Sequence, residues 1–437
     1  MRIQMDNVLD VLKDRGFVEQ TTHESELFEY FNQQKVHAYI GFDPTASSLH
    51  IGHLLPIMAL IHLQKAGHCP IALVGGGTGM IGDPSGKTET RQMLTEESIA
   101  SNVKSIRNQL ERYLDFGEGH AVLVNNAAWL KDLKYIEFLR NIGRHFSVNK
   151  MIKAESYRQR LEMEQNLAFI EFNYMLLQAY DFLELYNRNE CRLQMGGADQ
   201  WGNIVAGIEL IRKIRKVQTY GLTFPLITTA SGAKMGKTAK GAVWLDAERT
   251  SPYEYFQYWV NTDDKDVCRF LKLFTLLPLS EINEVERLKD ESLNGVKMVL
   301  AFEATRITHG MDSAIESYRA SIKIFGQRSL DEHILPSSAI PRRIDGTRDS
   351  AVPTSFRTMA LLKKGILAVE LFSDVGLVSS KSAARRLVEQ GGAYINGCRL
   401  QQVDYRVTLT DLSNNEILLS AGKKRIHRIL IGGENRD

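Results

Sequence analysis

The alternation of apolar and polar residues predicts a strand followed by a helix early in the chain. Residues 37–42, HAYIGF, are rich in aromatic and branched side chains, which favours a strand. The segment 43–45, Asp-Pro-Thr, ends the strand, because proline restricts the residue before it and has no amide proton. Ser48 is a suitable N-cap for a helix from Leu49, after which apolar residues recur at helical spacing.

The tetrad His50-Ile51-Gly52-His53 lies in the first turn of this predicted helix. Amide groups and the positive end of the helix dipole make such a turn an anion-binding site. Gly52 costs about 1 kcal/mol relative to alanine within a helix, which indicates that another group approaches the backbone there. His50 and His53 share a face and can donate to phosphate oxygens. A zinc pair or incidental surface histidines are the alternatives, but no His, Cys or Glu cluster supplies further ligands, so we predict no metal site.

A continuous apolar run over residues 70–74 predicts a buried strand parallel to the first. Strand, helix and strand in this order form a right-handed βαβ unit, which binds ligands at the carboxyl ends of its strands. The following pattern predicts mainly helices over 95–190, strands over 192–195 and 222–228, and a helix between these strands that ends near residue 216. The expected fold class is therefore α/β, with a Rossmann-like parallel-sheet domain first.

The second half of the chain has a different pattern, helical from Ser251 to about Phe325 and without predicted strands. Proline, serine and glycine then collect over 331–355, which is typical of a linker. Farther on, Ser380 is a suitable cap for a basic helix, and Asn396-Gly397 fits the type I′ turn of a β-hairpin. We expect an α-helical domain and then a small α+β domain. The predicted ranges are 1–230, 231–335, a linker at 336–358, and 359–437.

Composition and charge exclude several classes of protein. The 437 residues carry a net charge of only +2, so any nucleic-acid binding must come from local basic patches. The four cysteines are far apart and form no C-x-x-C pair, which indicates reduced thiols. No apolar run approaches the ~20 residues of a membrane span, and the N-terminus is helical with early acidic residues, unlike a targeting peptide. We expect a cytoplasmic protein that does not bind membranes.

Two glycine-rich segments after the second strand resemble nucleotide-binding fingerprints without satisfying them. Residues 77–82 match G-x-G-x-x-G, which must open a helix, yet Asp83-Pro84 follows at once and disfavours helical geometry. Residues 82–88 are one residue short of a Walker A loop. We reject both assignments. The glycines still allow a ligand to lie near the backbone, and Asp83 is able to anchor a cation.

Polar residues on the apolar helix predicted at 171–186 indicate a binding pocket. Tyr174, Gln178 and Asp181 follow the i, i+4, i+7 spacing and share one stripe. Three scattered polar residues often form a solvent-facing stripe instead, but no lysine or arginine accompanies these. A stripe of hydrogen-bonding groups with limited reach suits the wall of a small-molecule pocket.

Two further segments suit a nucleotide. Residues 196–201, GGADQW, follow a predicted strand, where Asp199 is able to accept from ribose hydroxyls and the glycines admit the sugar. Lys234 and Lys237 place two ammonium groups three residues apart on a glycine-containing loop. A solvated surface turn is the alternative for these lysines. Their occurrence together with the His50–His53 tetrad favours a phosphate site.

The order of these segments resembles that of the bacterial-type tyrosyl-tRNA synthetase family, within the class I aminoacyl-tRNA synthetases, over essentially the whole chain. The resemblance is carried by YIGFDPTASSLHIGH, GDPSGK, NYMLLQAYD, GGADQWGN and the KMSKS-like KMGKT. It implies activation of L-tyrosine with ATP and Mg²⁺, without a tightly bound cofactor, and transfer to tRNA(Tyr). It also implies a homodimer formed through a helical insertion near 110–170, an anticodon-binding helical domain and an RNA-binding C-terminal domain.

The resemblance also implies roles for individual residues. The tyrosine-binding residues are Tyr39, Thr78, Asp83, Asn126, Tyr174, Gln178, Asp181 and Gln200. The ATP-binding residues are Gly41, Asp43, Thr45, His50, Gly52, His53, Gly197, Asp199 and Lys237. The catalytic groups around the triphosphate are Thr45, His50, His53, Lys87, Arg91, Lys234, Lys237 and Thr238. Tyr39 and Asp181 are implied to hold the phenol hydroxyl, and Asp83, Tyr174 and Gln178 the ammonium group.

Basic clusters suggest where RNA binds. On the last domain they comprise Lys381, Arg385, Arg386, Arg399 and the segment 423–425. Candidates for the acceptor arm are Lys150, Lys153, Arg158, Arg160, Arg212, Lys213, Arg215 and Lys216. A solvated helix face without RNA contacts is the alternative for each of these residues.

Two departures from the family pattern accompany the resemblance. KMGKT carries glycine and threonine where KMSKS has serines, and Pro56 lies in the first turns of the helix after the tetrad. Neither removes a charged group that the chemistry needs. Two other functions stay open at this point, a nucleotidylyltransferase with the same histidine tetrad and a catalytically silent paralogue that binds RNA. Tyrosine-dependent ATP–pyrophosphate exchange distinguishes all three.

Overall fold

The computed structural model describes residues 7–83, 85, 94–230, 232, 235–238, 241–288, 291–326, 330–342, 352–413, 415–422 and 425–432. The chain forms two compact units, Met1–Thr250 with Asp263–Arg287, and Ser251–Thr262 with Leu288–Asp437. The range expected as one helical domain is thus divided between them. Buried Arg15 attaches the segment Asp263–Arg287 to the first unit, because its guanidinium donates to the carbonyls of Lys272, Thr275 and Leu277.

The first unit is built on a sheet whose described strands follow the order β1-β6-β5-β2-β3-β4. In this order, each pair of adjacent strands from β6 through to β4 is parallel. The strand β1 lies at the edge and pairs antiparallel with β6. The strands are β1 (Gln20–Thr21), β2 (His37–Phe42), β3 (Cys69–Val74), β4 (Val122–Asn125), β5 (Leu193–Gly197) and β6 (Tyr220–Phe224). Chain order runs from β2 to β3 and β4, then returns to β5 on the other side of β2. Such a reversal opens a crevice at the carboxyl ends of β2 and β5.

The predicted parallel sheet is confirmed, with differences at its margins. The strand β4 lies in the range that was predicted to be mainly helical. It is short and half-buried throughout, so its sequence pattern does not indicate a strand. The strand β6 ends at Phe224 rather than at 228, since Pro225 cannot donate to the ladder. The edge strand β1 was not predicted from its two residues.

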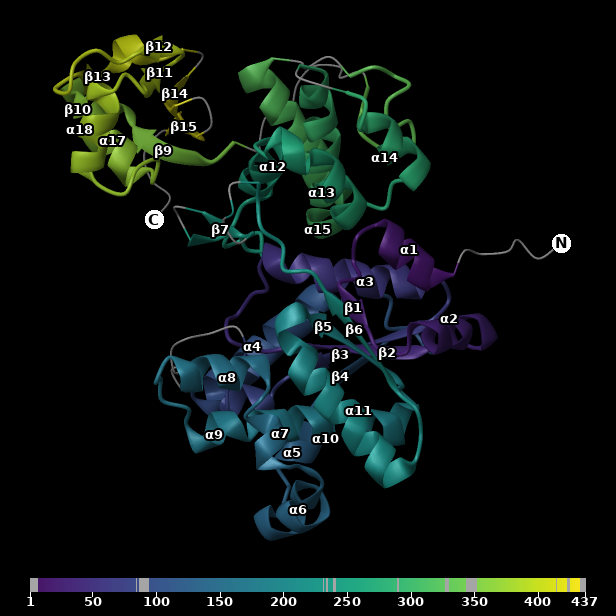
Figure 1. Cartoon of the computed structure of the whole chain (residues 1–437). Helices are drawn as coiled ribbons and strands as arrows, with labels where there is room; N and C mark the ends of the chain where they lie inside the picture. The colour runs from purple at the N-terminus through teal and green to yellow at the C-terminus, as the bar shows by residue number, and fades with distance from the viewer. Residues whose placement is uncertain are drawn as a thin grey trace. The chain divides into compact units, whose positions relative to one another are not determined.

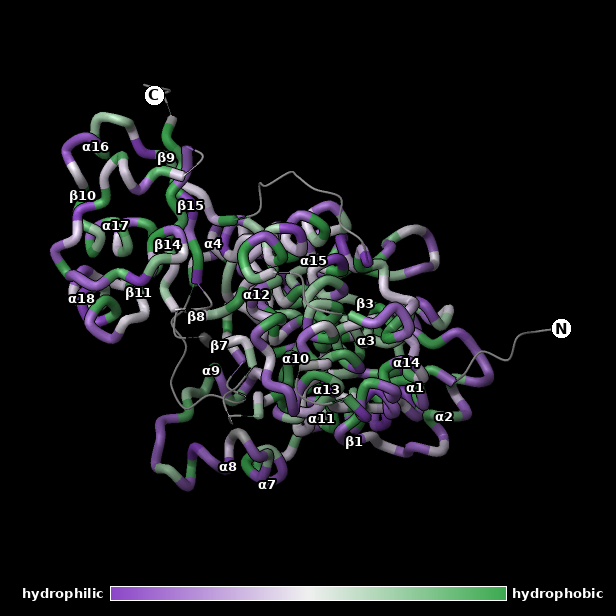
Figure 2. The backbone as a smooth tube through the Cα atoms, turned by 90° about the horizontal axis from the view of Figure 1, so that it is seen from above, coloured by the Kyte–Doolittle hydropathy of each residue, from purple (hydrophilic) through white to green (hydrophobic). Residues whose placement is uncertain are grey.

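Helices cover both sides of this sheet, with α1 and α3 on one side and α10 and α11 on the other (Figure 1). Every residue of β3 is buried, and hydrophobic colouring follows β3 and α3 in Figure 2. The helices are α1 (Val8–Asp14), α2 (Glu24–Gln33), α3 (Leu54–Lys65), α4 (Glu96–Leu110), α5 (Ala127–Leu130), α6 (Tyr135–Asn141), α7 (Val148–Met151), α8 (Glu155–Glu162), α9 (Phe169–Phe172), α10 (Tyr174–Asn189), α11 (Trp201–Arg215), α13 (Val267–Phe274) and α14 (Leu279–Val285). Shorter elements are the 3₁₀ turns η1 (Ile51–His53), η2 (Thr78–Met80), η3 (Gly143–His145), η4 (Ala198–Gln200) and η5 (Asp264–Asp266), and the hairpin strands β7 (Lys237–Thr238) and β8 (Gly241–Ala242).

The start of the helix after β2 differs from the prediction. Ser48 does not cap it, because its hydroxyl donates to the carbonyl of Leu49. The tetrad instead forms the 3₁₀ turn η1, with His50 as its N-cap, and α3 begins only at Leu54. The histidines therefore precede the α-helix rather than forming its first turn.

The second unit contains the remaining helices of the predicted helical range and the small sheet. Ser251 forms a capping box with Glu254 at the start of α12 (Pro252–Val260), and α15 (Glu291–Phe325) bends at Gly310. The described sheet follows the order β12-β11-β14-β15-β9, and β10 pairs with β13. Its elements are β9 (Thr354–Thr358), α16 (Met359–Lys364), β10 (Ile366–Leu367), α17 (Ala368–Asp374), α18 (Lys381–Glu389), β11 (Ala393–Ile395), β12 (Cys398–Arg399), β13 (Arg406–Val407), η6 (Leu409–Asp411), β14 (Glu416–Ala421) and β15 (Arg425–Gly432).

The local predictions for the small domain can be compared directly. The amide of Ala383 donates to Ser380 Oγ, so Ser380 caps α18 as predicted. Asn396 and Gly397 have φ of 48° and 81°, which confirms a turn with two positive φ angles. The sheet begins earlier than expected, since β9 lies inside the predicted linker and pairs parallel with β15. Among the described helices, none combines the length and apolarity that crossing a membrane requires.

Candidate active site

A cavity of about 400 Å³ opens at the carboxyl ends of β2 and β5. It gathers residues from β2, η1, η2, α10 and β5, and most of the predicted site residues line it. These are Tyr39, Gly41, Asp43, Thr45, His50, Gly52, His53, Thr78, Asp83, Tyr174, Gln178, Asp181, Gly197, Asp199 and Gln200. Lys87, Arg91 and Lys234 lie outside the described residues, and Lys237 and Thr238 are described only as backbone, in β7.

One end of the cavity is closed by Tyr39 and Asp181, each only 2% exposed. The Tyr39 hydroxyl has no hydrogen-bond partner among the described residues. A buried hydroxyl left unpaired costs about 1–3 kcal/mol, so this end is suited to receive another hydrogen-bonding group. Burial first, and then the nearby Asp181 charge, raise the pKa of the Tyr39 phenol far above its usual value, so it remains a donor.

Two side chains hold the Asp181 carboxylate in place. Asn126 Nδ2 donates to Oδ2 at 2.9 Å, and Trp129 Nε1 donates to Oδ1 at 2.7 Å. Burial raises the pKa of Asp181 to about 7, while these two bonds act in the opposite direction. Trp129 was not among the predicted residues, since nothing in its local sequence shows that the indole faces a helix 52 positions away.

Asn126 connects this end to the glycine-rich loop. It is fully buried, its Nδ2 also donates to Thr78 Oγ1 at 2.9 Å, and its Oδ1 accepts from the amide of Gly77 at 2.7 Å. The loop contains the turn η2 instead of the helix that a dinucleotide fingerprint requires, which agrees with rejecting that motif.

A chain of amide side chains forms the middle of the cavity. Gln200 Nε2 donates to Asp83 Oδ2 at 2.8 Å, and Gln178 Nε2 donates to Gln200 Oε1 at 3.1 Å. Buried Asn203 donates to Gln178 Oε1 at 3.0 Å and to Ser85 Oγ at 3.4 Å. Asn203 was not assigned a role from sequence, although it belongs to the quoted GGADQWGN segment. The network leaves a carboxylate and several amide oxygens grouped around one space.

Tyr174 lines the cavity together with Asp83 and Gln178, and it also contacts the end of β2. Its hydroxyl donates to Asp43 Oδ1 and Oδ2 at 3.2 and 3.3 Å. Burial, followed by the charge of Asp43, raises the pKa of Tyr174 well above its ordinary value. The bond therefore links α10 to the end of β2 and joins two residues that were predicted to serve different substrates.

At the other end of the cavity, the tetrad uses its own backbone to orient both histidines. His50 Nδ1 accepts from the amide of Gly52 at 3.0 Å, and His53 Nδ1 accepts from the amide of His50 at 3.1 Å. Each neutral ring then carries its proton on Nε2 and is a donor there. A Cβ at Gly52 would lie 2.8 Å from His50 Cε1, so the glycine is required by this ring. The close approach predicted from Gly52 is thus made within the protein.

The KMGKT segment lies against this tetrad. The residues that follow KMGKT bind the tetrad through the backbone. The amide of Ile51 donates to the carbonyl of Val243 at 2.9 Å, and the amide of Leu245 donates to the carbonyl of Leu49 at 2.9 Å. Gly236 has a φ of 91°, and a Cβ there would lie 2.7 Å from Ile51 Cγ2. The glycine that departs from KMSKS therefore permits both the backbone angle and the contact.

The comparisons with known proteins agree with this architecture. Residues 32–326 match the family model described as tRNA synthetases class I (W and Y), and residues 350–429 match the tyrosine–tRNA ligase SYY-like C-terminal domain. The tyrosine–tRNA ligase of Desulfosudis oleivorans is 60% identical over 97% of this chain and 99% of its own length. The chain belongs to the class I tyrosyl-tRNA synthetase family.

Other members of the tyrosyl-tRNA synthetase family are also similar. The tyrosine–tRNA ligase of Caldanaerobacter subterraneus is 49% identical, over 97% of this chain and 99% of its own. A C-terminally truncated mitochondrial tyrosyl-tRNA synthetase of Aspergillus nidulans is 30% identical, with a TM-score of 0.67 over 73% of this chain and 94% of that one. The tyrosyl-tRNA synthetase of Archaeoglobus fulgidus, 18% identical with a TM-score of 0.53, shares the fold over 71% of this chain and 99% of that one.

On the small domain, the basic residues predicted to bind RNA are exposed where the structure describes them, at Lys381, Arg385, Arg386, Arg399 and Arg425. Lys423 and Lys424 lie outside the described residues. Lys381, Arg385 and Arg386 project from α18, and the guanidinium of Arg399 lies against Gly391 just beyond the end of that helix. Arg160, a candidate for the acceptor arm, is only 2% exposed and pairs with Glu171 at 3.0 Å. It is therefore part of the core, and that assignment was wrong.

Proposed function

We propose that this chain activates L-tyrosine with ATP and then transfers it to tRNA(Tyr), using the cavity at the ends of β2 and β5 for both steps. Its family is that of the aminoacyl-tRNA ligases specific for tyrosine, so the activity is tyrosine–tRNA ligation. The observation that carries the assignment to this cavity is the buried Tyr39 hydroxyl, unpartnered among the described residues and close to the Asp181 carboxylate. A phenol at that end satisfies both groups.

The first step needs positioning more than proton transfer. The tyrosine carboxylate attacks the α-phosphorus of ATP, the bond to the β-phosphate oxygen breaks, and pyrophosphate leaves with that electron pair. A carboxylate is already ionised, so neither a general base nor a covalent enzyme nucleophile is required. The enzyme must align two anions and stabilise the charge that builds on pyrophosphate.

The proposed roles follow from the two ends of the cavity. The Nε2 protons of His50 and His53 donate to the phosphates, and Mg²⁺ arrives bound to ATP as part of the substrate. Lys87, Arg91, Lys234, Lys237 and Thr238 are proposed around the triphosphate from the family resemblance alone. The ribose lies near Gly197 and Asp199.

The amino-acid end selects tyrosine by its hydroxyl and its ammonium group. The phenol donates to Asp181 and accepts from Tyr39, while Asp83 and the oxygen of Gln178 receive the ammonium group. Phenylalanine would leave the buried Tyr39 hydroxyl unpaired and would bring no hydroxyl donor to the Asp181 carboxylate. Such sites reject the smaller analogue by about 10⁴–10⁵, and tyrosine-activating enzymes are themselves the standard example of this magnitude.

Isotope exchange between ATP and pyrophosphate tests the proposal. We expect exchange that depends on tyrosine and is near background with phenylalanine or without an amino acid. Exchange without any amino acid would favour a nucleotidylyltransferase, and the absence of exchange together with RNA binding would favour a silent paralogue. Either result would contradict the proposal.

We propose that the chain works as a homodimer that associates through the helical insertion near 110–170. Large apolar side chains are exposed over α6 to α9, at Tyr135, Ile136, Val148, Ile152, Leu161, Met163, Phe169 and Ile170. Phe169 is 69% exposed, so Phe169→Asp is expected to yield monomers in size-exclusion chromatography with light scattering. Phe356→Asp, at a phenylalanine 67% exposed in the other unit, is the matched control and should leave the dimer intact. Identical masses for the two variants would count against this interface.

The small domain is proposed to hold tRNA through α18 and Arg399. Phosphate contacts from basic side chains supply affinity without taking part in adenylate formation. Arg385→Glu should raise the KM for tRNA about tenfold and leave pyrophosphate exchange unchanged. Arg287, which is also exposed but lies in the first unit, provides the control Arg287→Glu. A loss of exchange in Arg385→Glu would contradict this division of work.

A further inference from the structure

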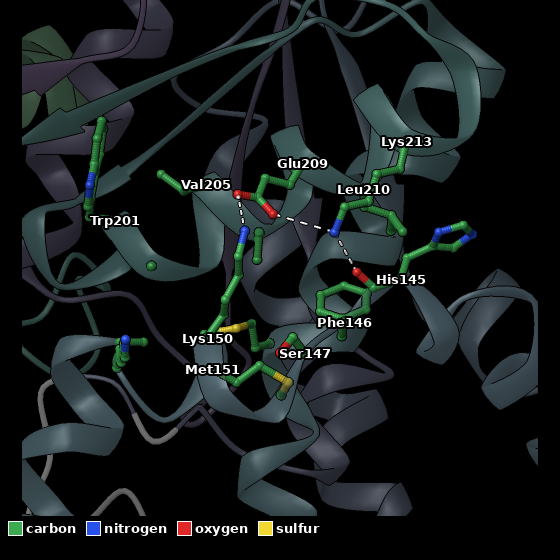
Figure 3. A pocket seen from close by; sticks show the side chains of 15 residues that line it. His145, Phe146, Ser147, Lys150, Met151, Trp201, Val205, Glu209, Leu210 and Lys213 are labelled. Atoms are coloured by element: carbon green, nitrogen blue, oxygen red, sulfur yellow. Dashed lines mark hydrogen bonds and ion pairs between the residues drawn. The ribbon is translucent and has the colours of Figure 1, made fainter.

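A second cavity, of about 260 Å³, lies in the first unit between α11, the start of α10 and the segment that contains η3 and α7 (Figure 3). It shares no lining residue with the tyrosine and ATP cavity. Its apolar surface comes from Phe146, Met151, Met175, Val205 and Leu210. None of these residues takes part in the mechanism proposed above.

The rim of this cavity is positively charged. Figure 3 shows Lys150 and Lys213 approaching the Glu209 carboxylate from two sides, each at 3.5 Å, and Lys153 also lines the rim. These distances exceed the 2.7–2.9 Å of a close charge-assisted hydrogen bond, so the ammonium groups keep capacity to donate. Three lysines and one glutamate line the cavity, which leaves it an excess of positive charge.

The pKa of His145, which also lines the cavity, is affected by the positive charges in this region. Desolvation lowers its pKa, and the charges of Arg144, Lys213 and Lys216 lower it further. The backbone carbonyl of His145 accepts from Lys213 Nζ at 2.6 Å, which holds that ammonium group at the mouth of the cavity. A cationic edge beside an apolar surface is complementary to a ligand with an anionic group on an apolar body.

We propose that this cavity binds a small amphiphilic anion, a flat body of about two fused rings that carries a single carboxylate or sulfonate. The size follows from the volume, because a cavity of about 150 Å³ lined by apolar side chains holds one benzene ring. The rings lie between Phe146, Met175 and Val205. The anionic group lies at Lys150 and Lys213 and competes with Glu209 for them.

Calorimetric titration of the full-length protein with 1-naphthoate, in saturating L-tyrosine, tests this site. Tyrosine fills the amino-acid pocket, so remaining binding belongs elsewhere. We expect a dissociation constant below about 1 mM. Val205→Trp, which fills the cavity from a half-buried position, and Lys150→Glu, which reverses a rim charge, should each weaken binding at least tenfold. Lys104→Glu, at an exposed position of α4 that does not line the cavity, should change it less than twofold.

The chemical class is tested by a neutral analogue. Naphthalene-1-methanol keeps the rings and lacks the charge, so it should bind at least tenfold more weakly than 1-naphthoate. Tyrosine binding and the thermal unfolding midpoint serve as folding controls for each variant. Equal binding of 1-naphthoate to wild type and Val205→Trp would overturn the proposal. Binding to the monomeric Phe169→Asp variant alone would also overturn it, since a second copy of the chain would then cover the cavity.

Discussion

The two ends of the active-site cavity are built in different ways. The amino-acid end is buried and made of side chains, where Asp181 is fixed by Asn126 and Trp129 from outside α10. The nucleotide end is more open and made largely of backbone, where η1 orients His50 and His53 through its own amides. One end therefore depends on tertiary packing, and the other on a short local segment.

This difference matches the chemistry of the two substrates. A neutral phenol differs from a phenyl ring only in its hydroxyl, so a site distinguishes them through polar groups that cost free energy when they are left unpaired. Such a cost arises only when these groups are buried away from water. A triphosphate carries enough charge to be held by backbone amides and side chains near solvent. We expect mutations at the amino-acid end to act on specificity and those at the nucleotide end to act on the KM for ATP.

The largest expected effect is at Asp181. Asp181→Asn keeps the shape of the side chain but replaces one carboxylate oxygen with a donor that faces Asn126 or Trp129. We expect kcat/KM for tyrosine to fall about 10²–10³-fold, equal to about 3–4 kcal/mol, while the KM for ATP changes little. Pyrophosphate exchange at varied substrate concentrations measures both. A variant within threefold of wild type would show that the hydroxyl is recognised elsewhere.

The raised pKa of Asp181 gives a pH dependence at the same end. Below about pH 7 the carboxyl of the free enzyme is protonated, and a substrate phenol donates best to the ionised form. Tyrosine affinity should therefore rise, by up to about tenfold per pH unit, until the pH passes about 7. In the free enzyme, the stability contributed by the protonated form is lost as pH rises through the same value. Equilibrium binding at several pH values should show this trend, and Asp181→Asn should abolish it.

At the nucleotide end, Gly236 provides the sharpest comparison. Gly236→Ala adds a Cβ 2.7 Å from Ile51 Cγ2 at a φ of 91° and should displace the segment from the tetrad. We expect the KM for ATP to rise about tenfold, with unchanged tyrosine binding. Gly241→Ala separates the two causes, since φ there is 108° but a Cβ would meet nothing within 4 Å. Equal effects of both substitutions would mean that backbone strain, rather than contact with Ile51, is responsible.

The smallest effect is expected at Tyr39, and its sign is informative. Tyr39→Phe removes a buried hydroxyl that has no partner among the described residues, so the free enzyme should become more stable, by up to about 1 kcal/mol. Tyrosine should nevertheless bind about fivefold more weakly. Tyr157→Phe is the matched control, because its hydroxyl donates to the carbonyl of Phe172 at 3.2 Å and its loss should destabilise the fold. Denaturant unfolding and tyrosine titration of both variants decide between these expectations.

Sequence patterns predicted the parallel strands β2 and β3, the hairpin turn at Asn396-Gly397 and the cap at Ser380. Each of these is a local preference, decided by side-chain shape or by the φ angles that a residue tolerates. The short strand β4 escaped prediction, because its four half-buried residues carry too little periodicity to separate a strand from a helix. The start of the small domain was not predicted either, because the pairing of β9 with β15 joins segments that are far apart in the chain.

The sequence by itself determined which chemical groups are present and which short segments present them, because turns, caps and apolar periodicity act over a few residues. Only the tertiary structure decided the partners of these groups. It placed Trp129 against Asp181, Tyr174 against Asp43, and the KMGKT segment against the tetrad. The reason is physical, since a hydrogen bond between buried side chains depends on how the sheet and its helices pack, and that packing is a property of the whole unit.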